Sequence, residues 1–401
     1  MKDYIDRPKY NARIRPFINK ALIKVLIGQR RVGKSYLMKQ VRDEIAHAGI
    51  CNFIVIDKEN EVFSHIDTAA DLTAYIKTKA VADAGVTNYV FVDEIQEIAN
   101  FENSIRSFAA QPNFDVYITG SNSEILSGEL ATRLSGRYIE IPVYSLDFKE
   151  FTVFHGLEKN QDSLHLFLKY GGMPFLRNLA LNDELVFEYL KNVFTSILYR
   201  DIVTRYGVRN VNFLDRLIRF TADNIGSMLN AKKISDYLKS QQIKISVNSV
   251  LDYLSYLVNA QVIVPVKRMD LRGKRTFEIG EKYYFQDLGM RNALSGYRVS
   301  DIGKLMENCV FHHLISHGYA VCTGDWQQKE IDFVAEKNNE RVYIQVAYLL
   351  TEQSTIDREF GNLNLIGDHY PKIVVSMDPQ SRNTLNGVEH WSLLRFLEGF
   401  G

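Results

Sequence analysis

The sequence predicts an α/β fold with a parallel-sheet core, followed by a helical connector, a segment of three helices with a β-hairpin, and a second α/β segment. Two observations predict the core. Short runs rich in β-branched and aromatic residues alternate with helical or polar segments over residues 21–143, as they do in three-layer α/β domains. A glycine-rich loop follows the first of these runs directly and ends where a helical pattern begins.

The five strand-like runs are expected to form the core sheet. Each is a short, mostly apolar stretch, which is typical of strands that are buried on both faces of a parallel sheet. The runs cover residues 21–27, 52–57, 89–94, 115–120 and 137–143. The ligand of such a sheet binds beyond the carboxyl ends of the strands.

The loop after the first run carries a complete phosphate-binding motif. Its sequence, GQRRVGKS at residues 28–35, matches G-x-x-x-x-G-K-[ST]. The two glycines allow backbone N–H groups to point at phosphate oxygens, next to the positive end of the following helix. Lys34 is expected to reach the β- and γ-phosphates, and the Ser35 hydroxyl to ligate Mg²⁺. The predicted nucleotide-binding residues are Gly28, Gln29, Arg30, Arg31, Val32, Gly33, Lys34, Ser35 and Tyr36.

Polar residues follow two further strands. Asp93 and Glu94 end the run YVFVDE. An aspartate there can hold the Mg²⁺ of a nucleotide, and the adjacent glutamate can polarise the attacking water. Asn122, in TGSNS after the fourth run, is placed to sense the γ-phosphate. The alternative, that TGSNS forms only a turn, stays open.

These motifs together resemble a known family. GQRRVGKS, YVFVDEIQ, ITGSNS and LSGRY resemble the core of AAA+ ATPases that carry a C-terminal DUF4143 region, and YGGMPFL at residues 170–176 resembles a motif that follows that core. The resemblance implies ATP as the nucleotide. It also implies an arginine that completes the site of a neighbouring subunit, for which Arg133 and Arg137 are candidates by position. Pairing of Arg137 with a local carboxylate is the alternative, and the oligomeric state stays open.

Four segments follow from these patterns. The AAA+ core covers residues 1–156, and a helical lid or connector covers 157–213. Residues 214–299 have the outline of a winged helix-turn-helix, with three helical runs before a hairpin. Residues 300–401 form the C-terminal α/β segment.

The predicted winged-helix segment is locally basic. Residues 231–276 contain nine lysines and arginines and three aspartates, in a chain with 48 basic and 48 acidic residues overall. This excess makes DNA a candidate partner through phosphate contacts. A protein partner is the alternative, because the third helical run carries few basic residues.

The C-terminal segment resembles a PD-(D/E)xK nuclease that has lost its active site. Glu307 lies on a predicted helix and Asp332 on the first strand of a predicted hairpin. Such enzymes need a second carboxylate and a lysine on the next strand to bind metal and activate water. This chain has Gln345 and Ala347 at those positions. We therefore expect a degenerate, nuclease-like domain without nuclease activity.

The composition agrees with a soluble globular protein. Hydrophobic residues make up 46% of the 401 residues and charged residues 24%, which is typical of globular domains and argues against disorder. The three cysteines are scattered, and no apolar stretch is long enough to cross a bilayer. We expect a cytoplasmic protein that does not bind membranes.

The predicted function is binding and hydrolysis of ATP with Mg²⁺, coupled to a conformational change that acts on DNA or on a protein partner. Lys34, Glu94, Asn122 and Arg137 are the predicted catalytic residues, and Ser35 and Asp93 the predicted metal ligands. The alternative is a nucleotide-gated switch that binds DNA or protein with little turnover.

Overall fold

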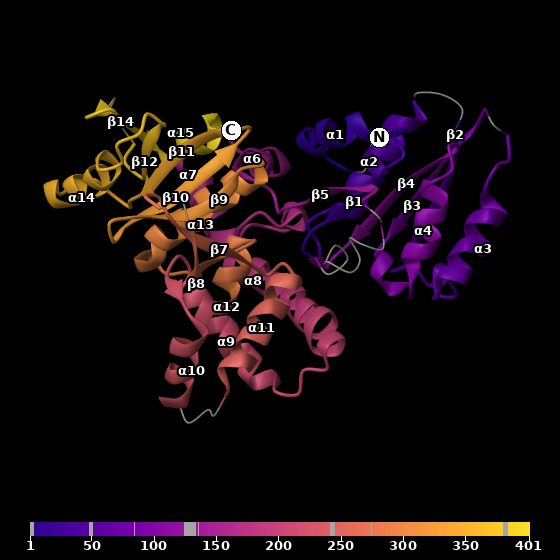
Figure 1. Cartoon of the computed structure of the whole chain (residues 1–401), viewed down its shortest axis with the longest axis horizontal. Coiled ribbons are helices and arrows are strands. Elements are labelled where there is room, and N and C mark those ends of the chain that lie inside the picture. Colours follow the sequence, from indigo (N-terminus) through magenta and orange to yellow (C-terminus); the bar gives the residue numbers. More distant parts are fainter. Residues whose placement is uncertain are drawn as a thin grey trace. The chain divides into compact units, whose positions relative to one another are not determined.

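The computed structural model describes residues 4–47, 51–83, 85–123, 134, 136–240, 245–273, 275–379 and 384–401, without the side chains of 275–279. The chain divides into two compact units (Figure 1). Unit 1 consists of Met1–Tyr144 with Asn259–Gln261, and unit 2 consists of Ser145–Val258 with Val262–Gly401.

Unit 1 is built on a parallel sheet whose five strands, in the described residues, have the order β2–β3–β4–β1–β5. All neighbouring strands in it are parallel. The strands are β1 (Ile23–Ile27), β2 (Cys51–Asp57), β3 (Thr87–Asp93), β4 (Phe114–Gly120) and β5 (Tyr138–Pro142). All five predicted runs are thus confirmed as strands, and the loops that follow β1, β3 and β4 meet at one edge of the sheet.

Helices cover this sheet. They are α1 (Pro8–Ile14), α2 (Lys34–Ala46), α3 (Ala69–Lys79) and α4 (Phe101–Ala109). Alternate strand residues such as Val25, Val90 and Val116 form one apolar core with α3 and α4, since successive side chains of a strand point to opposite faces. In Figure 1, α1 and α2 lie on the other side of the strands from α3 and α4.

Unit 2 combines helices with a mixed sheet. In the described residues this sheet has the strand order β13–β14–β12–β11–β10–β9–β7–β8–β6. The strands are β6 (Met228–Leu229), β7 (Ile263–Asp270), β8 (Arg275–Phe285), β9 (Ala320–Trp326), β10 (Lys329–Lys337), β11 (Glu340–Val346), β12 (Lys372–Ser376), β13 (Thr384–Leu385) and β14 (Val388–Ser392). The hairpin β7–β8 joins the C-terminal strands because β7 pairs in parallel with β9.

The helices of unit 2 include those that the sequence predicts. The segments are α6 (Phe148–His155), α7 (Gln161–Tyr170), α8 (Asp183–Ser196), the π-helix η6 (Ile197–Thr204), α9 (Val211–Asp223), α10 (Ala231–Ser240), α11 (Val247–Asn259), α12 (Leu288–Ser295), α13 (Ile302–Ser316), α14 (Gln353–Asn364) and α15 (Leu393–Gly399). The three helical runs before the hairpin are observed as α9, α10 and α11. The C-terminal helix and hairpin are observed as α13 and β10–β11. Within the described residues, no helix combines the length and the apolar character of a membrane span.

The YGGMPFL motif has a packing role in unit 2. A Cβ atom on Gly172 would lie 2.1 Å from the carbonyl oxygen of Leu146, and one on Gly289 would lie 1.9 Å from that of Tyr170. The N–H of Gly172 donates to the buried carboxylate of Asp287 at 2.7 Å. The motif therefore holds the connector against the start of α12, where only glycine fits.

Candidate functional site

The GQRRVGKS motif forms the loop between β1 and α2. Gly33 has a φ of 95°, in the left-handed region that favours glycine. A Cβ atom on Gly28 would lie 2.2 Å from the carbonyl oxygen of Val143, so this position has no room for a side chain. Because α2 begins at Lys34, the free N–H groups of its first turn lie next to the loop, as an anion site requires.

The side chain of Lys34 points into this loop. It is 4% exposed, and its Nζ donates to the carbonyl oxygens of Gly28 at 2.9 Å and Gln29 at 3.1 Å. The same Nζ lies 3.7 Å from Oε1 of Glu94. One ammonium group thus links the phosphate-binding loop to the acidic end of β3.

Ser35 and Asp93 come together as predicted. Asp93 is the last residue of β3 and is buried, and its carboxylate accepts a hydrogen bond from the hydroxyl group of Thr119. Burial raises the pKa of Asp93 above its ordinary value, while the hydroxyl groups of Ser35 and Thr119 act against this shift. A hydroxyl and a carboxylate from two different elements thus meet beside the loop.

Glu94 is held by several side chains. Its backbone is left-handed, with a φ of 52°, and its N–H donates to Oγ1 of Thr119 at 3.0 Å. Its Oε2 accepts from Ser121 at 3.0 Å and from Gln96. Burial alone would raise the pKa of Glu94, but the charges of Lys34 and Arg30 outweigh it and hold that pKa below its ordinary value. Glu94 is therefore ionised at neutral pH.

Asn122 lies at the same edge of the sheet. Gly120 at the end of β4 pairs with Ile27 at the end of β1, and Asn122 follows two residues later with no exposed surface. Thr119 and Ser121, which contact Asp93 and Glu94, were not predicted as site residues. Their position at the carboxyl end of β4, beside the end of β3, is the signal that could have identified them.

The remaining predicted loop residues differ in exposure. Gln29, Arg30 and Val32 are buried, whereas Arg31 is exposed and Tyr36 is 55% exposed. Arg30 forms an ion pair with Glu59 at 3.1 Å and lies 3.9 Å from Oε2 of Glu94. Arg30 and Lys34 of the motif thus both lie next to the carboxylate of Glu94.

Arg137 lies at the opposite edge of the sheet. Its carbonyl oxygen accepts from the N–H of Ile23, the first residue of β1, whereas the phosphate-binding loop follows the last residue, Ile27. The five residues of β1 separate the two edges by about 16 Å, at ~3.3 Å per residue. Arg137 is exposed and does not reach the loop of its own chain. Arg133 lies outside the described residues.

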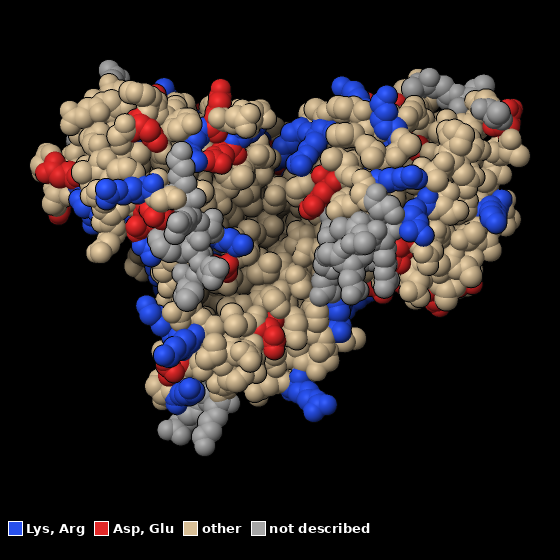
Figure 2. Space-filling view, viewed as in Figure 1, with Lys and Arg blue, Asp and Glu red and all other residues tan. Residues whose placement is uncertain are grey.

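The basic segment 231–276 has exposed cations in the part that the structure describes, but one of the predicted cations is paired. Lys232, Lys233, Lys239, Lys267 and Arg272 are exposed. Arg268 was counted with them, but its guanidinium pairs with Asp325 on β9. Lys244 and Lys274 lie outside the described residues, as does the side chain of Arg275. On the face in Figure 2, basic side chains with an acidic one among them lie where Figure 1 places α10.

Glu307 and Asp332 come together in unit 2, as predicted, but around a lysine. Lys282, on β8, lies 2.8 Å from Oε1 of Glu307 and 3.7 Å from Oδ1 of Asp332. Gln345, where a nuclease would have a carboxylate, accepts the N–H of Asp332 at 3.3 Å, and Ala347 is buried. No local pattern in the sequence points to Lys282, because its partners lie on other elements.

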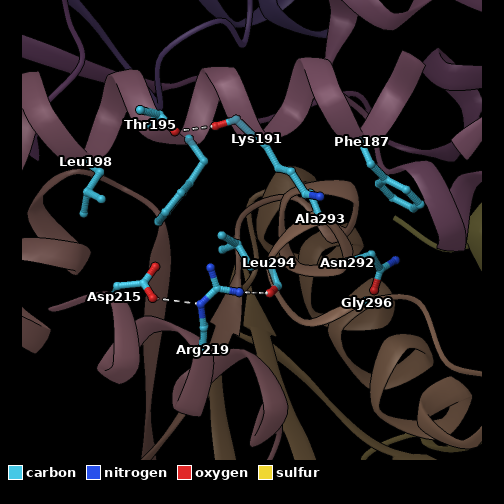
Figure 3. A pocket seen from close by; sticks show the side chains of 11 residues that line it. Phe187, Lys191, Thr195, Leu198, Asp215, Arg219, Asn292, Ala293, Leu294 and Gly296 are labelled. Carbon is cyan, nitrogen blue, oxygen red and sulfur yellow. Dashed lines mark hydrogen bonds and ion pairs between the residues drawn. The ribbon is translucent and has the colours of Figure 1, made fainter. Parts of the chain in front are cut away.

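A separate groove lies in unit 2 between α8, α9 and α12 (Figure 3). Its volume is about 560 Å³. The guanidinium of Arg219 donates to Asp215 at 2.9 Å and to the carbonyl oxygen of Leu294 at 2.8 Å. The hydroxyl of Thr195 donates to the carbonyl oxygen of Lys191. The groove therefore combines these partly exposed polar groups with an apolar wall of Phe187, Phe194, Leu198 and Leu294.

Family models match two regions of the chain. Residues 20–152 match an AAA domain. Residues 161–301 match a domain of unknown function, DUF8612. The region after the AAA domain is thus matched by a different model from the DUF4143 region that the sequence resemblance implied.

Two relatives and one solved structure are similar over most of the chain. An uncharacterized protein of Haemophilus influenzae is 35% identical over 395 residues, which cover 97% of each chain. An uncharacterized protein of Methanocaldococcus jannaschii is 30% identical over 345 residues, which cover 82% of this chain and 75% of the relative. The structure of a Walker-type ATPase of Pyrococcus abyssi has a TM-score of 0.52 at 18% identity, over 73% of this chain and 96% of that one.

The solved structure is too distant in sequence to show more than the fold. That fold agrees with the parallel sheet and phosphate-binding loop of unit 1. The two relatives extend over the AAA domain and the region after it. The chain therefore belongs to the protein family of these Haemophilus influenzae and Methanocaldococcus jannaschii relatives, and its N-terminal part is an AAA domain with the P-loop NTPase fold.

Proposed function

We propose that the protein binds ATP with Mg²⁺ in the phosphate-binding loop of unit 1 and hydrolyses it. One observation carries this proposal: Lys34, Ser35, Asp93 and Glu94 converge at the carboxyl edge of the sheet, beside a loop with no room for a side chain at Gly28. The match to an AAA domain supports the same function. The choice of ATP follows from the family resemblance.

The residues present fit a magnesium-bound triphosphate. The Ser35 hydroxyl lies near enough to the Asp93 carboxylate to lower its pKa, and oxygen ligands of this kind suit Mg²⁺. Bound Mg²⁺ would supply positive charge that offsets the negative charge developing on the phosphates. The carboxyl edge of the sheet is also where ligands of parallel α/β sheets bind.

The protein side chains would act in sequence on the phosphates and the water. Lys34 exchanges the carbonyl oxygens of Gly28 and Gln29 for phosphate oxygens, which are stronger acceptors because they are charged. Glu94, which is ionised, then orients a water molecule and takes its proton. Asn122 lies at the end of the adjacent strand, from which its amide can donate to the terminal phosphate.

Arg137 is assigned to the site of a neighbouring subunit. It is exposed at the edge of the sheet opposite its own phosphate-binding loop, and a residue that acts on a second copy must be exposed. The proposal therefore includes an oligomer in which this edge of one subunit faces the phosphate-binding loop of the next.

Unit 2 is the candidate for receiving the conformational change. A winged helix at residues 214–299 is supported by the element order α9–β6–α10–α11–β7–β8 and by the placing of β8 between β6 and β7. The residues of α11 include no lysine or arginine, and its exposed positions are Asn248, Leu251, Asp252 and Ser255. DNA contact would thus depend on phosphate contacts from Lys232, Lys233 and Lys267, and a protein partner stays the alternative.

A nucleotide-gated switch with little turnover is the second candidate function. The observation that favours it is the network around Glu94, in which Ser121, Gln96, Lys34 and Arg30 surround its carboxylate. A base held in this way must be released before it can act on water.

One experiment separates the two functions. ATP turnover of the purified full chain is measured with and without duplex DNA, and the mass of the particle is determined by light scattering in the same buffers. Turnover that rises with DNA supports the coupled ATPase, whereas tight ATP binding with almost no turnover supports the switch. Absence of ATP binding contradicts both.

The salt dependence of any DNA binding tests the contacts separately. If lysines of the basic segment neutralise phosphates, replacing Lys232 and Lys267 by alanine lowers the slope of log affinity against log salt by roughly two units. An unchanged slope would show that these two lysines do not contact DNA phosphates.

A further inference from the structure

A buried lysine stands at the centre of an acidic pocket in unit 2. Lys282, on β8, is 1% exposed. Its Nζ lies 2.8 Å from Oε1 of Glu307, 2.7 Å from Oε1 of Glu330 and 3.7 Å from Oδ1 of Asp332. One ammonium group is thus surrounded by three carboxylates, one from α13 and two from β10.

The charge of this lysine is maintained by its surroundings. Burial alone would lower the pKa of Lys282, but the charges of Glu307, Asp332 and Glu330 outweigh it and raise that pKa. Burial and the charge of Glu307 raise the pKa of Asp332 well above its ordinary value. Lys282 is therefore a permanent cation at neutral pH and the main compensation for the acidic groups around it.

Two further donors contact the carboxylates of the pocket. The hydroxyl of Tyr284 donates to Oε1 of Glu307 at 2.5 Å, and the N–H of Val346 donates to Oδ2 of Asp332 at 2.8 Å. Gly226, with a φ of 71°, lies so close to Glu307 that a Cβ atom would be 2.8 Å from its Oε2. Three elements, β8, β11 and the turn before β6, thus pack against the carboxylates of Glu307 and Asp332.

The pocket has the negative charge of a cation site, but the ammonium group of Lys282 already lies between its carboxylates. Among the residues that the structure describes, no group of three His, Cys, Asp or Glu side chains is placed to hold a metal ion. The oxygen atoms nearest to Nζ, at 2.7 and 2.8 Å, are at ammonium hydrogen-bond distances. Oxygen ligands of Ca²⁺ lie only slightly closer, at about 2.3–2.6 Å.

We propose that the ammonium group of Lys282 takes the place of a divalent cation in this pocket, so that the domain keeps its acidic cluster but binds no metal there. A lysine ammonium is a compact point charge with three donors, and here it contacts carboxylates from two elements as a metal would. This inference goes beyond the proposed ATPase and does not depend on it, because all of its residues lie in unit 2.

The proposal predicts that the pocket gains a cation site when the lysine is shortened. In nucleotide-free full chain, Lys282→Ala should unfold at a lower temperature than the wild type in a chelator, because it leaves buried carboxylates without compensation. Added Ca²⁺ should restore much of the lost stability, since a ligand that binds only the folded state stabilises it. Calorimetry should show Ca²⁺ binding that the wild type lacks.

Two controls identify the pocket as the place of binding. Lys282→Ala/Glu307→Gln should lose the added Ca²⁺ binding, because Glu307 is the carboxylate that α13 contributes and is much less exposed than Glu330. The single variant Glu307→Gln, which keeps Lys282, should give the same Ca²⁺ titration as the wild type. Binding by the wild type that Glu307→Gln removes overturns the proposal, and so does a folded Lys282→Ala variant that gains no Ca²⁺ binding.

A second variant covers the case in which Lys282→Ala does not fold in the chelator. Folding of that variant only in the presence of Ca²⁺ supports the proposal directly. If Lys282→Ala folds in neither condition, Lys282→Ala/Glu330→Gln is tested instead, because it has one negative charge fewer around the missing ammonium group. The second substitution is mild, since the Glu330 side chain is 43% exposed. That double variant should gain Ca²⁺ binding, and a folded form without such binding overturns the proposal.

Discussion

The ammonium group of Lys34 lies 3.7 Å from a carboxylate oxygen of Glu94. The cation expected to bind phosphates and the base expected to act on water are therefore in contact with each other. A phosphate group that enters the loop competes with Glu94 for Lys34. Phosphate binding and the release of Glu94 are thus linked through one side chain.

Replacing Lys34 tests the phosphate site. Lys34→Ala removes the one point charge that the loop directs at the phosphates, so ATP affinity measured by calorimetry should fall below detection or drop severely. Lys77→Ala, an exposed lysine on α3, serves as the matched control and should bind ATP normally. Equal affinity of Lys34→Ala and the control would show that the loop does not bind the triphosphate.

Replacing Glu94 separates binding from hydrolysis. Glu94→Gln keeps the size of the side chain but removes the proton acceptor, so ATP should stay bound while turnover falls by about 10² or more. Glu97→Gln, an exposed neighbour, should keep full turnover. Survival of turnover in Glu94→Gln would mean that another residue activates the water.

Arg137 is tested by mixing two inactive variants. Arg137→Ala should bind ATP but turn it over slowly, because the lost cation belongs to the neighbour's site. Mixed with Lys34→Ala, it should regain activity, since some interfaces then pair an intact phosphate-binding loop with an intact arginine. Turnover measured across mixing ratios checks this. Full activity of Arg137→Ala as a monomer would contradict a role between subunits.

How far the sequence predicts the structure depends on the range of the contacts. The five core strands were predicted because buried parallel strands are continuous apolar runs. Lys24, in the middle of β1, departs from that pattern, and only the fold shows that it pairs with Asp115 on β4, both without appreciable exposure. Ser35 and Asp93 were predicted to converge because the carboxyl ends of the parallel strands in one sheet lie at the same edge, where its ligands bind.

Pairs between distant elements were missed for the same reason. Arg268 was assigned to a basic surface from its neighbours in sequence, but its partner Asp325 lies on β9, which joins β7 in one sheet. Lys282 gave no signal either, because its three carboxylates lie on α13 and β10. Local composition records how many charges a segment carries but not which of them the fold neutralises.

A buried histidine predicts how stability changes with acid. His313 on α13 is 2% exposed, and its Nε2 bonds to the carbonyl oxygen of Phe400 at 2.7 Å. Burial, with the nearby His317, lowers the pKa of His313 to about 3 from an ordinary value of 6.5. Below pH 6.5, His313 binds a proton in the unfolded chain but not in the folded chain. The free energy of unfolding therefore falls as pH falls towards 3.

The size of this effect is about 1.4 kcal/mol per pH unit for one group. Chemical denaturation between neutral and mildly acidic pH should show this loss, and His313→Gln, which keeps a donor for Phe400 without the titration, should reduce its slope. His165→Gln, an exposed histidine, should leave the slope unchanged. An equal slope in both variants would assign the acid sensitivity to other groups, such as His155, whose pKa burial lowers to about 4.

The last prediction is that the C-terminal part of unit 2 does not cut DNA with Mg²⁺ or Mn²⁺. Water attack on a phosphodiester needs a metal held by carboxylates and a group that activates the water, and Gln345 and Ala347 supply neither. Lys282 adds a second obstacle, because its ammonium lies against Glu307 and Glu330 at 2.8 and 2.7 Å.

Restoring the missing groups alone should therefore fail. Gln345→Glu/Ala347→Lys adds an anionic ligand and a lysine, but Lys282 still occupies the centre of the carboxylates, so supercoiled plasmid should stay intact with either metal. The wild type should leave it intact as well, and Glu307→Ala/Asp332→Ala is the control for contaminating nucleases. Cleavage by the wild type that this control lacks would show that the acidic pocket binds a catalytic metal beside Lys282.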